Sequence, residues 1–208
     1  MTIKNILYLA SKSPRRSELL SQIGMSFSVL AVDIDESVNM NEVADNYVLR
    51  LATEKSLEGW NRIKQQNKAV LGSDTAVIIN GEILGKPESH LDAKRMLRLL
   101  SGKTHQVMTA VALAVTTPDS PQNMRPELTS ILSVSDVSFK DLTDLEIEQY
   151  VASGECDDKA GSYAIQGLAA AYITHLSGSY SGVMGLPLYE TYELLNKAGI
   201  RQDSLVVS

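Results

Sequence analysis

The chain has 208 residues, 44% of them hydrophobic, which is enough to form the core of one domain spanning residues 1–208. Its formal net charge of −6 excludes the broad basic surface that undirected nucleic-acid binding needs. No apolar run reaches the length of about 18 residues that spans a bilayer, and no signal-peptide pattern is present, so we expect a cytoplasmic protein with no membrane partner. The single cysteine, Cys156, excludes an intramolecular disulfide.

The first predicted elements are a strand and a helix joined by a polar, basic turn. Residues 6–9 are apolar and residues 17–23 are amphipathic. Ser13 can cap the helix through its hydroxyl, Pro14 suits the first helical position, and Gly24 can end the helix in a left-handed conformation. The pattern predicts a strand, a turn and a helix in that order.

The turn at residues 10–16 has the properties of an anion site. The helix N-terminus offers free N–H groups and partial positive charge, and Arg15 and Arg16 add two planar guanidinium groups that match phosphate oxygens. Phosphate is therefore the natural ligand. The alternative is an ordinary helix start whose arginines pair with surface carboxylates.

The rest of the chain alternates strands with helices. An apolar strand begins at residue 69 and ends at Asp74, and the dipeptide Asn80-Gly81 predicts a hairpin between the strands 76–79 and 82–84. Further strands are predicted at 26–30, 106–115, 128–139 and 169–175, and helices at 43–60, 89–100, 143–152 and 187–197. Loops are predicted at 116–126, 157–167 and 178–185. This order predicts an α/β fold with a mixed central sheet flanked by helices.

Two carboxylates are candidates for chemistry. Asp74 lies where a buried strand is predicted to end, the position at which open α/β sheets place ligands, and Glu36 lies in an acidic turn. Two carboxylates facing a phosphate-binding turn suggest a divalent cation, Mg²⁺ or Mn²⁺, held by Glu36 and Asp74. The alternatives are a turn aspartate bonded to its own backbone and a solvated surface glutamate.

Other side chains add less specific signals. Lys55, Lys86 and Lys159 can each supply a point charge to a phosphate oxygen, but each can equally be a solvated surface lysine. The three histidines are far apart in the sequence, so zinc is not expected. The sequence contains no Walker-type motif and no Rossmann spacing.

Several of these segments together resemble the Maf family of nucleoside triphosphate pyrophosphatases. The segments are SKSPRR at 11–16, GSDT at 72–75, GKP at 85–87, SGKTHQVMT at 101–109, DKAGSYAIQG at 158–167, GSY at 178–180 and VMGLPLYET at 183–191. The resemblance implies a bilobed α/β fold with a cleft, a divalent metal, and cleavage between the α and β phosphates to give a nucleoside monophosphate and pyrophosphate. It also implies a homodimer, and it makes Asp74 the proton acceptor.

Three positions are similar to the branch of this family that acts on dTTP and UTP. They are Arg15, Thr75 and Gln166, where the branch acting on 7-methyl-GTP typically carries Trp, Gln and Glu. The amide of Gln166 can pair with both O4 and N3–H of uracil or thymine. Lys12 and Ser73 depart from the residues common in the family, but they only adjoin the motifs.

The resulting hypothesis is a hydrolase acting on the acid anhydride of a small nucleotide substrate. Asp74 and Glu36 are its catalytic carboxylates, and its substrate ligands are Ser11, Ser13, Arg15, Arg16, Lys55, Thr75, Lys86, Lys159 and Gln166. In this hypothesis Asp74 takes the proton of a water that attacks the α-phosphorus. The alternatives are the same reaction on 7-methyl-GTP or modified purine nucleotides, and a non-catalytic regulator of septum formation.

Overall fold

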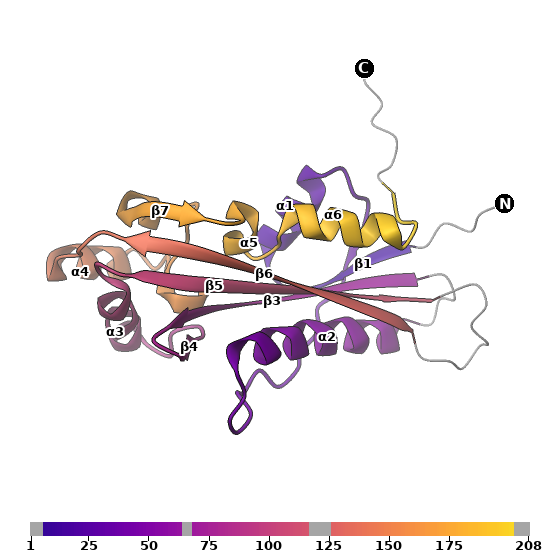
Figure 1. Cartoon of the computed structure of the whole chain (residues 1–208), viewed down its shortest axis with the longest axis horizontal. Helices are drawn as coiled ribbons and strands as arrows, with labels where there is room; N and C mark the ends of the chain where they lie inside the picture. Colours follow the sequence, from indigo (N-terminus) through magenta and orange to yellow (C-terminus); the bar gives the residue numbers. More distant parts are fainter. Residues whose placement is uncertain (1–5, 64–67, 117–125, 202–208) are drawn as a thin grey trace, which may run out of the picture. The chain divides into compact units, whose positions relative to one another are not determined.

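The computed structural model describes residues 6–63, 68–116 and 126–201. The described residues form a seven-stranded sheet with the order β2-β1-β3-β5-β6-β7, in which β4 pairs with β3. Helices pack against this sheet (Figure 1). Strand β1 pairs in parallel with β2 and β3, whereas β3–β4 and β6–β7 are antiparallel. The α/β class, the mixed sheet and the flanking helices are therefore confirmed.

The described residues form two compact units, and strands β3, β5 and β6 contribute residues to both. Unit 1 comprises 6–74, 110–132 and 185–201, and unit 2 comprises 75–109 and 133–184, apart from the ranges that are not described. The expectation of a single domain stays a prediction. No helix among the described residues is long and apolar enough to cross a membrane.

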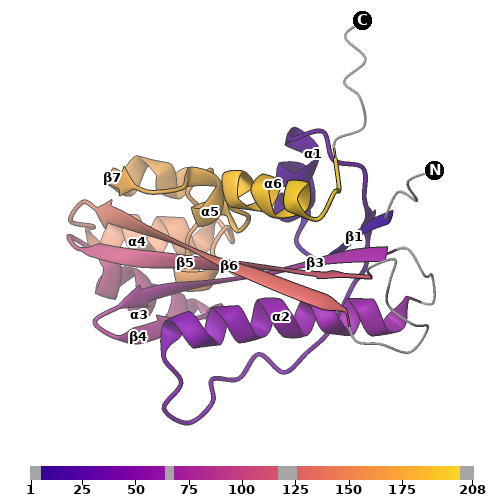
Figure 2. The ribbon, with the colours of Figure 1, turned by 45° about the vertical axis from the view of Figure 1, so that its right-hand side comes forward.

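Unit 1 contains the parallel part of the sheet. Its elements are β1 (Ile6–Ala10), α1 (Pro14–Gln22), β2 (Ser28–Val29), α2 (Ala44–Arg62), the first half of β3 (Lys68–Ile79), the adjoining parts of β5 (Thr104–Val115) and β6 (Glu127–Phe139), and α6 (Leu188–Lys197). Helix α2 lies on one face of these strands, and α1 and α6 lie on the other (Figures 1 and 2). Because parallel strands need crossover connections, α1 links β1 to β2 and α2 links β2 to β3.

Helix α2 approaches β3 closely because β3 has a glycine at the point of contact. A Cβ atom at Gly72 would clash with the carbonyl oxygen of Ala52 and lie 2.7 Å from the backbone nitrogen of Ser56. The hydroxyl of Ser56 donates a hydrogen bond of 2.7 Å to the carbonyl oxygen of Val70. This contact fixes α2 against β3 in the segment that precedes Asp74.

Unit 2 has its own hydrophobic core. Its elements are the second half of β3, β4 (Glu82–Leu84), α3 (His90–Leu100), the adjoining parts of β5 and β6, α4 (Asp144–Ala152), the 3₁₀ helices η1 (Ala160–Ser162) and η2 (Leu168–Tyr172), β7 (Ile173–Ser177) and α5 (Tyr180–Met184). Leu97 of α3, Val137 of β6 and Tyr150 of α4 are buried in one cluster with Val77 of β3. Helices α3 and α4 thus share the core beside the sheet.

Several local predictions are confirmed. Asn80 and Gly81 have φ values of 53° and 80°, as a tight hairpin requires, and they connect β3 to the antiparallel β4. The side chain of Ser89 caps α3 by accepting a hydrogen bond from the backbone nitrogen of Asp92. Thr143 and Glu146 form both hydrogen bonds of a capping box at the start of α4.

Other local predictions are wrong. The Ser13 side chain makes no capping hydrogen bond; instead the backbone nitrogen of Ser13 donates to Oγ of Ser11 at 3.1 Å. The strand predicted at 26–30 contains only residues 28 and 29. The strand predicted at 169–175 begins as the 3₁₀ helix η2, and the loop predicted at 178–185 contains α5. The predicted loop at 116–126 falls mostly outside the described residues.

Candidate active site

The prediction that a strand ends at Asp74 is wrong, because β3 continues through Asp74 to Ile79. The pairing of β1 with β3, however, ends at Ala10 opposite Gly72, so Asp74 lies just beyond the carboxyl end of a parallel strand pair. That is the edge at which α/β sheets place ligands. The polar residues of this segment do not end the strand, since the buried carboxylate of Asp74 has a charged partner on α2.

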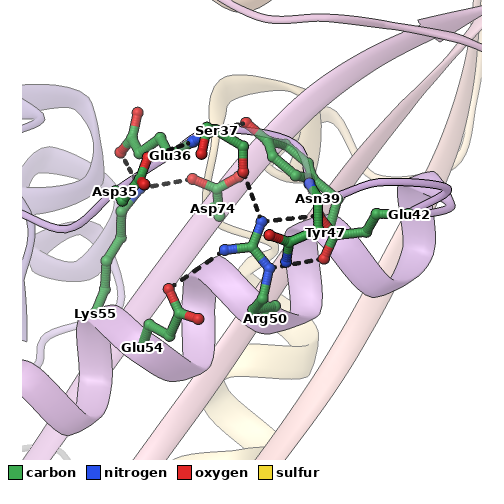
Figure 3. Close-up of polar contacts among 10 residues, drawn as sticks. All are labelled: Asp35, Glu36, Ser37, Asn39, Glu42, Tyr47, Arg50, Glu54, Lys55 and Asp74. Atoms are coloured by element: carbon green, nitrogen blue, oxygen red, sulfur yellow. Dashed lines mark hydrogen bonds and ion pairs between the residues drawn. The ribbon is translucent and has the colours of Figure 1, made fainter.

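That partner is Lys55, whose side chain contacts both predicted catalytic carboxylates. Its Nζ lies 2.6 Å from Oδ1 of Asp74 and 2.6 Å from Oε1 of Glu36 (Figure 3). The side chains of Lys55 and Asp74 are only 10% and 9% exposed, whereas that of Glu36 is 44% exposed. The structure therefore brings three of the predicted site residues together, and the alternative of a turn aspartate is wrong for Asp74.

The burial of Asp74 changes its acid–base behaviour. Burial raises the pKa of the Asp74 carboxyl above its usual value, and the charges of Lys55 and Arg16 oppose this shift. Burial also lowers the pKa of the Arg16 guanidinium, while the charge of Asp74 opposes that shift. A carboxylate whose pKa is raised is a better proton acceptor, because its basicity lies closer to the working pH.

The basic turn before α1 belongs to the same unit as this cluster. Nε of Arg16 donates a hydrogen bond of 2.8 Å to the carbonyl oxygen of Gly185, and Oγ of Ser73 donates to the same oxygen at 3.0 Å. Ser11 is buried, and Arg15 is half-buried in the first turn of α1, which contains no acidic residue. Arg16 is thus held by the chain segment beside Asp74, at a helix start that favours an anion.

Four predicted substrate ligands belong to unit 2. Oγ1 of Thr75 lies 3.0 Å from Oγ1 of Thr109, and Lys159 forms an ion pair with Asp158. The remaining two, Lys86 and Gln166, are exposed. Their roles toward a substrate stay predictions.

Sequence reasoning missed a second set of contacts around Glu36. Arg50 of α2 binds Glu42 and lowers the pKa of that carboxyl to about 2, and the hydroxyl of Tyr47 donates a hydrogen bond of 3.0 Å to the carbonyl oxygen of Glu36. Figure 3 shows that both side chains come from the helix that also carries Lys55. The available signal was weak: a glutamate just before a helix and an arginine within it.

The described residues contain no group of three or more histidine, cysteine, aspartate and glutamate side chains that could hold a metal ion alone. Asp74 and Glu36 nevertheless present two carboxylate oxygens to one cation, the ammonium of Lys55. Mg²⁺ is commonly bound by one or two carboxylates with substrate phosphates and water as the other ligands. The donor set therefore fits a divalent ion whose coordination the substrate completes.

These features define an α/β protein with a basic helix start in the same unit as a buried carboxylate. Residues 6–198 match the family model described as Maf-like protein. A protein from Pseudoalteromonas atlantica named dTTP/UTP pyrophosphatase is 49% identical over 200 residues, covering 95% of this chain and all of the relative. Proteins with the same name from Shewanella and from Escherichia coli O157:H7 are each 52% identical, covering 94% and 91% of this chain and 99% and 91% of their own lengths. The chain belongs to the Maf family.

Proposed function

We propose that this chain is a dTTP/UTP pyrophosphatase, a nucleoside triphosphate diphosphatase that releases pyrophosphate and leaves a nucleoside monophosphate. The observation that carries the proposal is the placement of Lys55 between Glu36 and Asp74, in the unit that also holds Arg16 at a helix start. The name shared by relatives with about half of their residues identical to this chain supports the substrate. Its role is to remove these nucleotides, or modified forms of them, from the nucleotide pool.

In this mechanism the triphosphate binds through Arg15 and Arg16 at the positive end of the α1 dipole. Lys55 supplies a further positive charge and holds Asp74 by a hydrogen bond of 2.6 Å. Asp74 accepts the proton of the water that attacks the α-phosphorus, because its burial raises its pKa. Glu36 and Asp74 would hold Mg²⁺ or Mn²⁺, which when bound neutralises charge on the phosphate oxygens.

The family resemblance adds finer parts to the proposal. These parts are a substrate cleft in a bilobed fold, Ser11, Ser13, Lys86 and Lys159 as further ligands, and a cytoplasmic homodimer, all of which the resemblance implies. Thr75 and Gln166 select the base with Arg15. The exposed amide of Gln166 can both donate and accept a hydrogen bond, as the O4 and N3–H edge of thymine or uracil requires.

The test is pyrophosphate release from dTTP, UTP, CTP, modified pyrimidine triphosphates, GTP and 7-methyl-GTP, with Mg²⁺ or Mn²⁺ and with a chelator. Metal-dependent release that is fastest with dTTP and UTP would support the proposal. A preference for 7-methyl-GTP would keep the chemistry but overturn the assignment of the base pocket. No release from any nucleotide would overturn the enzyme assignment and favour a regulatory protein.

The role of Asp74 is tested by Asp74→Asn, which keeps the shape of the side chain but removes its basicity. We expect kcat with dTTP to fall by about 10²–10⁴, the usual contribution of a general base, while substrate binding persists. Asp45→Asn, an equivalent change at an exposed residue of α2, is the matched control and should leave kcat unchanged. A normal kcat in Asp74→Asn would reject Asp74 as the proton acceptor.

A further inference from the structure

Glu36 reaches the site on the 30–43 loop, which joins β2 to α2 and contains no helix or strand. Its contact with Lys55 is an ion pair in which the glutamate is 44% exposed, and such pairs contribute little on their own. Ordering a loop of this kind also costs backbone entropy. The position of Glu36 therefore depends on other contacts that hold the 30–43 loop against α2.

Arg50 of α2 provides the main contacts of this kind. Its Nε donates to Oε1 of Glu42 at 2.7 Å, and its Nη2 donates to Oε2 of Glu42 at 2.8 Å, which is the bidentate geometry of a strong arginine–carboxylate pair. The same Nη2 donates to the carbonyl oxygen of Ser37 at 2.9 Å. One guanidinium thus binds the loop at the residue after Glu36 and again two residues before α2 (Figure 3).

Neighbouring contacts close the loop around this pair. The backbone nitrogen of Asn39 donates to Oε2 of Glu42 at 2.9 Å, and the buried Tyr47 donates to the carbonyl oxygen of Glu36 at 3.0 Å. The Arg50 guanidinium also lies 5.7 Å from the centre of the Tyr47 ring. The side chains of Arg50 and Glu42 are 23% and 8% exposed, so water screens their ion pair less than it screens a surface pair.

We propose that Arg50 is a positioning residue that keeps Glu36 in contact with Lys55 by clamping the 30–43 loop to α2. The inference rests on the proposed function, because it concerns how often the three-residue cluster of Glu36, Lys55 and Asp74 is complete. Arg50 acts through Glu36 and Glu42 rather than on the substrate. Because Arg50 and Lys55 belong to the same helix, holding the loop to Arg50 also fixes Glu36 relative to Lys55.

The kinetic test compares Arg50→Gln with wild type on dTTP. We expect kcat to fall about tenfold with KM changed less than about threefold, because the cluster is complete in a smaller fraction of molecules. Glu54→Gln is the matched control: it removes the 3.4 Å contact of Glu54 with the same guanidinium but leaves the loop contacts, and kcat should not change. In a Glu36→Gln background, Arg50→Gln should cause no further loss.

Hydrogen exchange provides a readout that does not need activity. In Arg50→Gln the backbone amides of residues 36–42 should exchange faster, that of Asn39 above all, while amides inside α2 keep their protection. Should Arg50→Gln fail to fold, Glu42→Gln tests the same clamp with the arginine intact.

The outcomes separate this inference from the proposed function. Three results would overturn the positioning role while leaving the enzyme assignment in place: a normal kcat in Arg50→Gln, a loss that adds to that of Glu36→Gln, or unchanged hydrogen exchange of residues 36–42. If wild type releases no pyrophosphate, the proposed function fails, and the exchange measurement alone decides whether Arg50 clamps the loop.

Discussion

The ion pair between Lys55 and Asp74 gives a quantitative prediction for stability. Replacing Lys55 by methionine keeps an apolar stem of similar length but removes the ammonium group and its hydrogen bond of 2.6 Å to Asp74. The carboxylate, which is only 9% exposed, is then buried without its closest cation. We therefore expect Lys55→Met to destabilise unit 1.

The size of the effect follows from the cost of an unpaired buried charge. Removing one partner of a buried ion pair usually costs about 3–5 kcal/mol. The nearby charge of Arg16 still favours ionised Asp74, which places the expected loss at the lower end, about 3 kcal/mol. With a denaturant slope of about 2 kcal/mol per molar urea, the unfolding midpoint should fall by about 1.5 M.

The fluorescence of the single tryptophan, Trp60, provides the assay. This residue lies on α2, and its Nε1 donates a hydrogen bond of 3.2 Å to Oγ1 of Thr116, so its emission reports unfolding of unit 1. Urea titrations at pH 7 would compare wild type with Lys55→Met. Lys12→Met is the matched control, because Lys12 pairs with Asp33 at the surface and its loss should not move the midpoint.

A second substitution separates the charge from the packing of the lysine stem. In Lys55→Met combined with Asp74→Asn, the buried carboxylate is gone and only the 44% exposed Glu36 loses its cation, so most of the lost stability should return. Equal midpoints for wild type and Lys55→Met would refute the reasoning. So would a double variant that is no more stable than Lys55→Met, since the loss would then come from packing rather than from the buried carboxylate.

Three further predictions concern the base pocket, a buried histidine and the contact between α2 and β3. Gln166→Glu should reduce the preference for dTTP and UTP over GTP by tenfold or more, because a carboxylate cannot donate to O4, whereas the control Gln149→Glu on α4 should leave the preference intact. Equal substrate preferences in wild type and Gln166→Glu would remove Gln166 from the pocket. Burial lowers the pKa of His105 from 6.5 to about 4, so the free energy of unfolding should be highest above pH 6.5 and fall by about 3 kcal/mol as the pH drops to 4. An NMR titration of His105 with a midpoint near 6.5 would contradict this. Gly72→Ala should lower stability by about 2 kcal/mol through a clash with Ala52, as a thermal midpoint would show, and an unchanged midpoint would mean that α2 can shift freely.

Features of the fold that depend on neighbouring residues were predictable from the sequence. The hairpin at Asn80-Gly81 and the capping box of Thr143 and Glu146 are set by residues within four positions of each other, and both are confirmed. The predicted Ser13 cap is wrong, and the side-chain hydroxyl that supports this turn is that of Ser11, which accepts a hydrogen bond from the Ser13 backbone. Local signals thus identify the element but not always which of two similar side chains supports it.

The contacts that build the candidate site are not local. Lys55 and Asp74 are 19 residues apart, and Arg16 binds the carbonyl oxygen of a residue 169 positions away. The sequence indicated which residue types could handle a phosphate, but it could not show that Lys55 lies between the two carboxylates. It also gave no reason to connect Arg50 with Glu36, because that connection depends on how the 30–43 loop folds back onto α2.

Helix α2 therefore supports the site from two directions. Towards β3, Gly72 and the hydroxyl of Ser56 allow the close contact that places Lys55 beside Asp74. Towards the loop, Tyr47 and Arg50 bind the carbonyl oxygens of Glu36 and of Ser37, the residue that follows it. A shift of this one helix would move the lysine away from Asp74 and release Glu36 together. The cluster should consequently respond to substitutions on the buried face of α2 as a unit, with losses in kcat that are not additive.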